Sequence, residues 1–182
     1  MRKFDNQKFW NDRYKNNPKL GSGPGSRGQN AKMKKDYLDN LIAENKIQTV
    51  LDYGCGDLNC LSVDKIPTYY GVDTSSILLQ KNKNNFPQHS WLSSIEGVHK
   101  DLKFQLVICS DVLIHQDTRE KFDKIFNNCI ELTESFFVFT VLNSKSHAVR
   151  NVFYYDLDEI YVKSKVLSFR DVDMFVYDKR NR

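Results

Sequence analysis

A short apolar strand that runs into a glycine turn most constrains the fold of this chain. Residues 48–53 are largely apolar or β-branched, and Gly54-Cys55-Gly56 follows at once. A buried parallel strand needs such a run, and the turn after it needs glycine so that backbone can approach a ligand. An acid about 20 residues further on, here Asp73, is placed to bind ribose hydroxyls. The pairing predicts a ligand with an adenosine or nucleotide moiety.

The length and composition favour one globular domain. The chain has 182 residues, of which 40% are hydrophobic and 13% aromatic, so it can bury a sizeable core. No apolar run reaches about 18 residues, and the first residues are too polar for a signal peptide, which predicts a soluble, cytoplasmic protein without a membrane partner. The four cysteines show no C-x-x-C spacing, so we expect reduced thiols and no metal site.

Positive charge is concentrated near the N-terminus. Residues 1–48 carry 11 Lys/Arg against 5 Asp/Glu, although the whole chain has a net charge of only +4. Such a patch could attract an anionic substrate, nucleic acid included. The interpretation we favour is simpler, namely the solvated faces of two surface helices.

Alternating strand and helix patterns predict an α/β fold. We expect helices at 5–16, about 30–46 and 118–130, the last with an Asp117/Glu120 capping box, and irregular structure at 21–28. The expected strands are 48–53, 68–72, 89–92, 104–109, 135–142, 161–168 and 172–178, the last two antiparallel. The first crossover leaves room for a helix of little more than two turns.

Two nucleotide-binding motifs fail on this sequence. Read as G-x-G-x-x-G, positions 54–59 have Asn59 where the third glycine belongs, which counts against a nicotinamide enzyme. Neither glycine cluster runs on into Gly-Lys-Ser/Thr, so a phosphate-binding P-loop is excluded as well.

Three blocks together are more specific: residues 50–57 (VLDYGCGD), 70–75 (YGVDTS) and 104–115 (FQLVICSDVLIH). In order and spacing they resemble the strand-end motifs of the class I S-adenosylmethionine-dependent methyltransferases, over about residues 48–142. The resemblance implies a single-domain Rossmann-like fold: a doubly wound, mostly parallel sheet with an antiparallel C-terminal strand and helices on both faces. Residues 1–46 would form N-terminal helices and a glycine-rich lid, and residues 47–182 the core.

The resemblance also implies a site for S-adenosylmethionine. The first motif would line its methionine end, Asp73 would hold the ribose, and residues after the third strand would flank adenine. The implied cofactor residues are Asp52, Gly54, Cys55, Gly56, Asp73, Thr74, Ser75, Leu92, Ser93, Ser94 and Ser110. The alternative for Asp73 is a helix N-cap ahead of residues 75–77.

Catalytic candidates lie where the fourth expected strand ends. His115 is the first candidate for a general base, because imidazole titrates near neutrality, and Asp111 accompanies it. Two alternatives stay open. His115 could brace the cofactor loop, or alignment of the acceptor could suffice without any base.

The N-terminal segment resembles the lid of some small-molecule methyltransferases. Trp10, Tyr14 and the glycines of 21–28 would close over the cofactor and exclude water, the alternative being a flexible linker. Candidate acceptor residues are Arg27, Lys35, Asn143 and His147. We expect methyl transfer to an oxygen or nitrogen of a small polar acceptor, a sugar or metabolite. The alternatives are a non-catalytic cofactor-binding subunit and an RNA (cap or ribose) methyltransferase, and the oligomeric state stays open.

Overall fold

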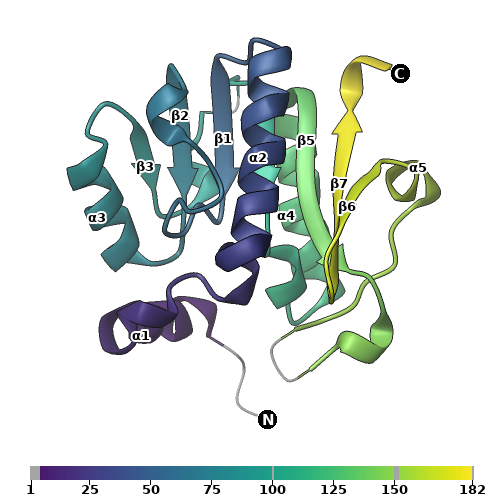
Figure 1. The fold of residues 1–182 in the computed structure, drawn as a ribbon, viewed down its shortest axis with the longest axis horizontal. Coiled ribbons are helices and arrows are strands. Elements are labelled where there is room, and N and C mark those ends of the chain that lie inside the picture. Colours follow the sequence, from purple (N-terminus) through teal and green to yellow (C-terminus); the bar gives the residue numbers. More distant parts are fainter. Residues whose placement is uncertain (1–4, 100, 150–151, 182) are drawn as a thin grey trace. The chain divides into compact units, whose positions relative to one another are not determined.

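The computed structural model describes residues 5–99, 101–149 and 152–181, which gather into two compact units (Figure 1). The first unit spans residues 5–99, and the second comprises the described residues from 101 onward. In the described part of the chain, no helix is both long and apolar enough to cross a membrane.

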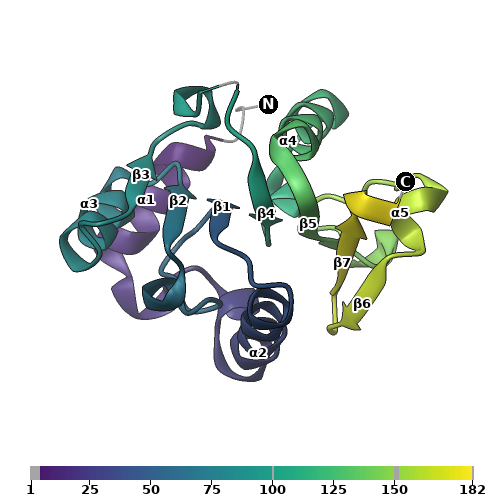
Figure 2. The same cartoon turned by 90° about the horizontal axis from the view of Figure 1, so that it is seen from above.

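The first unit is built on three parallel strands in the order β3-β2-β1. Its elements are α1 (Asn6–Asn16), α2 (Gly28–Glu44), β1 (Thr49–Tyr53), β2 (Thr68–Val72), α3 (Ser76–Asn85) and β3 (Ser90–Leu92). Thr49 pairs with Thr68, and Tyr70 pairs with Ser90, so the carboxyl ends of all three strands meet at one edge. Helix α3 packs on β3 and α1, and Figure 2 shows α2 to one side of the strands.

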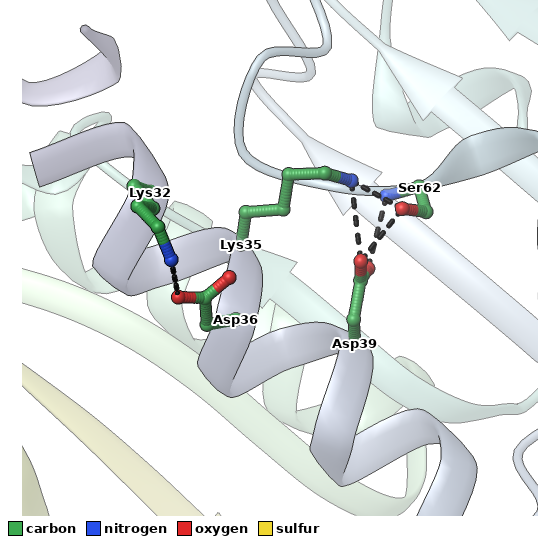
Figure 3. A network of polar contacts seen from close by, with 5 residues as sticks. All are labelled: Lys32, Lys35, Asp36, Asp39 and Ser62. Atoms are coloured by element: carbon green, nitrogen blue, oxygen red, sulfur yellow. Dashed lines mark hydrogen bonds and ion pairs between the residues drawn. The ribbon is translucent and has the colours of Figure 1, made fainter. Parts of the chain in front are cut away.

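A polar cluster attaches α2 to the crossover between β1 and β2 (Figure 3). Asp39 accepts hydrogen bonds from the Ser62 amide (3.0 Å) and hydroxyl (2.6 Å), and Lys35 bonds both Asp39 (3.2 Å) and the Ser62 hydroxyl. Burial alone would raise the pKa of the Asp39 carboxyl, but the bonds from Ser62 and Lys35 outweigh it and hold that pKa below its usual value. The crossover, which lacks an α-helix, is thereby fixed to the helix beside it.

The second unit combines one parallel and two antiparallel strand pairs in the order β4-β5-β7-β6. Its elements are β4 (Phe104–Cys109), α4 (Arg119–Leu132), β5 (Thr133–Leu142), α5 (Glu159–Val162), β6 (Lys165–Ser168) and β7 (Val172–Asp178). Helix α4 packs on β4 and β5. Strands β4 and β5 are buried almost throughout, which explains their continuous apolar sequence.

The sequence predicted most of these elements. The bounds of β2, β4 and β7 agree with the expected ranges, and the antiparallel pairing of β6 with β7 is confirmed. The expected α/β class with a mostly parallel sheet is likewise confirmed, although two C-terminal strands, not one, are antiparallel.

Four local predictions were wrong. The first crossover contains only a 3-10 turn at Val63–Lys65, because Gly56 (φ 53°) and Leu58 (φ 62°) turn the chain out of a right-handed helix and Ser62 is bonded to Asp39 of α2. The cap of α4 is Thr118, which accepts from the Lys121 amide (3.3 Å), whereas Asp117 pairs with the Lys121 ammonium. Residues 161 and 162 are helical, since Tyr161 turns inward against Phe126. The segment at 21–28, expected to be irregular, contains a 3-10 turn at Pro24–Ser26 and ends where α2 begins at Gly28.

Candidate functional site

The glycine turn after β1 folds back onto the end of β2. The amides of Gly54 and Cys55 both donate to the carbonyl of Val72, at 2.7 and 3.1 Å. Gly54 has φ 82° and Gly56 has φ 53°, left-handed values that side chains other than glycine's disfavour. The backbone alone therefore favours glycine at both positions.

Asp73, the residue after β2, connects this turn to the next helix. One carboxylate oxygen accepts from the Gly56 amide (2.9 Å) and the other from the Ser75 amide (2.8 Å). Burial raises the pKa of Asp73, and these two hydrogen bonds act against that rise. Each carboxylate oxygen has more than one lone-pair site, so Asp73 keeps capacity to accept from a ribose hydroxyl.

Ser75, and not Asp73, is the N-cap of α3. Its hydroxyl oxygen accepts from the Leu78 amide (3.4 Å), and the hydroxyl donates to Asn11 Oδ1 (2.9 Å). Ser75 is fully buried. The start of α3 is thus bonded both to Asp73 and to α1. Asp73 is not the helix cap but bridges the glycine turn and the Ser75 amide.

Asp52 lies two residues before Gly54 and is buried. Its carboxylate accepts from the Tyr69 hydroxyl at 2.9 Å. Burial raises the pKa of Asp52 to about 7, the Tyr69 bond opposes this, and the nearby Asp73 adds to it. Burial, followed by Asp73 and Asp52, also raises the pKa of the adjacent Cys55 thiol, which makes Cys55 a poor nucleophile.

The N-terminal segment lies directly on the glycine turn. The Ser22 amide donates to Asp57 Oδ2 (3.1 Å), and the Asp57 amide donates to Ser22 Oγ (3.1 Å). The same Ser22 oxygen is 2.7 Å from the Tyr14 hydroxyl, and burial raises the pKa of that phenol. A Cβ on Gly56 would collide with Ser22 Oγ, so the space that this glycine leaves is filled by the segment.

Side chains of α1 hold the segment in this position. Arg13 Nε donates to the Gly21 carbonyl (2.7 Å), and another guanidinium nitrogen donates to the Leu20 carbonyl (3.2 Å). The Arg13 guanidinium lies 5.6 Å from the Trp10 ring centre, and Trp10 stacks on Tyr14 at 6.0 Å. Sequence reasoning selected Trp10 and Tyr14 but missed Ser22, Asp57 and Arg13. Adjacent glycines hinted at Ser22 and Asp57, and nothing in the local sequence hinted at Arg13.

The residues expected near adenine lie beside Asp73 in the sheet. The Asp73 amide donates to the Leu92 carbonyl (3.1 Å), which brings the ends of β2 and β3 together. Thr74 is half-buried and Ser93 is exposed. Ser94 begins the next turn, where its hydroxyl accepts from the Glu96 amide (3.2 Å).

Two expected acceptor residues of this unit have other partners. Lys35 belongs to the cluster of Figure 3, where its ammonium bonds Asp39 and Ser62. The Arg27 side chain is exposed and, like the Asp57 carboxylate, lies where a Cβ on Gly21 would be.

In the second unit, Asp111 has an unusual backbone. Its φ is 58°, its amide donates to Thr140 Oγ1 (2.7 Å), and the Thr140 hydroxyl donates back to Asp111 Oδ1 (3.1 Å). Thr140 is fully buried in β5. A strained non-glycine residue held by its surroundings is a feature of functional sites.

The other candidates of this unit follow β4 and β5. Ser110 Oγ is buried and has no hydrogen-bond partner among the described residues. His115 ends the 3-10 turn Leu113–His115. Asn143 Oδ1 is 2.8 Å from His147 Nδ1, and Asn143 Nδ2 donates to the carbonyl of Phe169 (3.2 Å).

Comparisons with known proteins relate the chain to others through structure alone. No family model matches it, and no curated protein is significantly similar in sequence. Magnesium protoporphyrin IX methyltransferase (ChlM) from Synechocystis PCC 6803, solved with S-adenosylmethionine, is 13% identical, with a TM-score of 0.67 over 98% of this chain and 99% of that one.

Two further structures agree with this match. The PH0226 protein from Pyrococcus horikoshii OT3 is 14% identical, with a TM-score of 0.61 over 92% of this chain and 98% of that one. The N-methyltransferase NodS from Bradyrhizobium japonicum WM9, solved with S-adenosyl-L-homocysteine, is 14% identical, with a TM-score of 0.58 over 75% and 73%. The predicted Rossmann-like fold of the class I S-adenosylmethionine-dependent methyltransferases is thereby confirmed.

Proposed function

We propose that this chain is an S-adenosylmethionine-dependent methyltransferase that acts on an oxygen or nitrogen of a small polar acceptor, a sugar or metabolite. The observation that carries the proposal is the coupling of Asp73 to the glycine turn through the Gly56 amide (2.9 Å). It joins the turn and the acid at the carboxyl ends of adjacent parallel strands, where open α/β sheets bind their ligands.

The residues of the first unit suit this cofactor. Gly54, in the left-handed region, exposes backbone without a side chain close to Asp52. This part of the turn would bind the methionine moiety of the cofactor. Asp73 would accept hydrogen bonds from the ribose hydroxyls, and Leu92, Ser93 and Ser94 would flank adenine. Ser22 and Tyr14 would cover the turn and exclude water from it. We assign the lid role to the segment that carries them.

When bound, S-adenosylmethionine would supply a methyl group on a sulfonium sulfur, whose carbon an acceptor lone pair can attack while the sulfur leaves as a thioether. Alignment of the acceptor by the protein accounts for much of the acceleration in such a step. His115 would take the acceptor's proton, and Asp111, fixed by Thr140, would orient the reacting group. Ser110 Oγ, buried and without a partner among the described residues, offers a hydrogen bond that a ligand could complete.

The acceptor is proposed from the residues near the strand ends. Asn143 and His147 form a polar pair after β5, and Arg27 is exposed ahead of α2. Such groups can bind hydroxyl or carboxylate groups of a small molecule. The name of one structural relative gives magnesium protoporphyrin IX as acceptor and that of another gives only methylation at nitrogen, so the shared fold does not select among acceptors.

Isothermal titration with S-adenosylmethionine tests the proposal first, and saturable heat is the expected result. Transfer of a labelled methyl group is then measured into a small-molecule extract and, separately, into RNA. Label in small molecules supports the proposal. Label in RNA alone would show that the acceptor is RNA and not a small molecule. Binding without any transfer would indicate a non-catalytic subunit. Absence of binding would refute S-adenosylmethionine as the cofactor.

A further inference from the structure

A small hollow in the second unit lies between α4 and the segment 156–161. Its volume is about 80 Å³, roughly the space that two or three water molecules occupy in the liquid. Pockets that enclose whole small molecules measure about 300–1,000 Å³. The hollow therefore has room for the end of one side chain and not for a metabolite. None of its lining residues belongs to the candidate site described above.

Aromatic rings form the apolar wall of this hollow. Phe122 and Phe126 lie one turn apart on α4, are both buried, and stack with 5.7 Å between their ring centres. Tyr161, from α5, meets the Phe126 ring edge-on at 5.0 Å. Aromatic rings attract cations, and they also cover the aliphatic stems of basic side chains. Such a wall suits a cation that is carried on an apolar stem.

One guanidinium of the chain already uses this combination of groups. Arg119 Nε donates to Asp123 Oδ1 (2.7 Å), and a second guanidinium nitrogen donates to the Asp156 carbonyl (3.0 Å). The guanidinium carbon lies 5.3 Å from the Phe122 ring centre. A carboxylate, a carbonyl and a ring together thus hold an arginine at this surface.

The lining keeps an excess of negative charge after Arg119 is counted. Three carboxylates stand against one guanidinium, a net charge of −2, and these groups belong to Asp123, Asp156, Asp158 and Arg119. The Asp158 carboxylate has no hydrogen bond or ion pair among the described residues, and it does not cap α5. It is therefore available to form a charge-assisted hydrogen bond with an incoming cation.

Apolar side chains beside the hollow are exposed. Ile160 and Val162, which flank Tyr161 in the sequence of α5, are 48% and 50% exposed. A free amine or amino acid would leave them in water, whereas a protein segment could cover them. The exposed apolar groups and the small volume of the hollow both favour a side chain presented by another protein.

We propose that this hollow is a docking site for an arginine side chain of a partner protein, presented on a segment with apolar neighbours. The guanidinium would lie against the Tyr161 ring and pair with Asp158. Arginine suits the site better than lysine, because a planar guanidinium can stack on a ring and bind a carboxylate through two parallel hydrogen bonds. The inference does not depend on the proposed function, since it requires neither the cofactor nor methyl transfer.

Nuclear magnetic resonance titration of the full chain with two peptides tests the inference. One is Ac-Ala-Leu-Arg-Leu-Ala-amide, and in the other citrulline replaces arginine, which exchanges the guanidinium for a neutral urea of nearly the same shape. The arginine peptide should shift amide signals of α4 and of residues 156–161, and should bind about tenfold more tightly than the citrulline peptide. Asp158→Asn should weaken binding of the arginine peptide about tenfold.

Glu159→Gln is the matched control. It removes the neighbouring carboxylate, which lies 3.9 Å from the Lys163 ammonium and is not part of the lining, so affinity should stay at the wild-type value. Thermal unfolding of each variant checks that it folds. Asn127→Asp, which adds a carboxylate at an exposed position of the lining, should tighten binding and carries the test if Asp158→Asn does not fold.

Three results would overturn the inference. Equal affinity for the two peptides would exclude recognition of the guanidinium. An equal loss of affinity in Asp158→Asn and Glu159→Gln would show attraction to surface charge in general and not to this hollow. Binding of N-acetylarginine amide as tight as that of the arginine peptide would indicate a site for a free small cation instead of a protein.

Discussion

Ser22 and Asp57 bind each other's backbone amides, each side chain accepting at 3.1 Å from the amide of the other residue. The two residues are 35 positions apart, and the pair fastens the glycine-rich segment to the turn after β1. The Tyr14 hydroxyl, 2.7 Å from Ser22 Oγ, extends the contact to α1.

Ser22→Ala should loosen this segment. The change leaves the Asp57 amide and the Tyr14 hydroxyl without the Ser22 oxygen, at a cost of about 0.5–1.5 kcal/mol per hydrogen bond. Hydrogen exchange of the amides between residues 20 and 26 should accelerate by about tenfold. Ser26→Ala, on the same segment, is the control. Equal exchange in both variants would contradict a fastening role for Ser22.

Asp73→Asn should weaken cofactor binding and also loosen the turn. The carboxylate accepts hydrogen bonds from two backbone amides, those of Gly56 and Ser75. Asparagine keeps one acceptor oxygen but presents an NH₂ group, which cannot accept, to one of these amides. Loss of one charge-assisted hydrogen bond costs roughly 1.5–3 kcal/mol, or about 10- to 100-fold in affinity for S-adenosylhomocysteine. Calorimetry measures the affinity, and denaturant unfolding measures the change in stability. Unchanged affinity in a folded variant would exclude Asp73 from the ligand site.

Thr140→Val should destabilise the protein and release Asp111. The substitution keeps the side-chain shape in the fully buried site but removes both hydrogen bonds to Asp111. We expect a loss of about 1–3 kcal/mol in the free energy of unfolding, measured in urea. Thr140→Ser, which keeps the hydroxyl, should recover much of that loss. A Thr140→Val variant as stable as the wild type would contradict a stabilising role for the hydrogen bonds to Asp111.

Asp52 should make the folding stability depend on pH. Its pKa in the folded protein is raised from 3.8 to about 7, so between these values the folded chain binds a proton that the unfolded chain releases. The free energy of unfolding should therefore fall as pH rises through this window, by at most about 1.4 kcal/mol per pH unit for this residue. Urea titrations at pH 4.5 and 7 should show a smaller fall for Asp52→Asn. The same fall in both proteins would contradict the raised pKa.

Strands were the most predictable part of this fold, for a physical reason. Strands β2 and β4 carry short apolar or β-branched runs, and β7 carries a mostly apolar one. Each run is flanked by polar residues or proline, so local sequence determines where each strand begins and ends. The cap of α4 was mistaken because Asp117 and Thr118 are both good cap residues, and only the backbone selects Thr118. Helix α5 was missed because its Tyr161 is fixed by contact with Phe126, which lies 35 positions away.

Some contacts of the candidate site could be predicted from sequence and others could not. The pairing of the glycine turn with Asp73 could be anticipated from spacing, since parallel strands bring their ends together. The bonds of Ser22 to Asp57 and of Tyr69 to Asp52 could not, because neither follows a helical or strand period within one element. Lys35 shows how a plausible candidate from sequence can have a structural role instead. A basic residue that seemed suited to an anionic acceptor is engaged by Asp39 and Ser62.

A crystal structure with S-adenosylhomocysteine tests the central claim most directly. The account predicts the nucleoside at the glycine turn, with a ribose hydroxyl within hydrogen-bond distance of Asp73 and with Ser22 still bound to Asp57 over the turn. A ligand found elsewhere, or at the turn with Asp73 making only its bonds to Gly56 and Ser75, would contradict it.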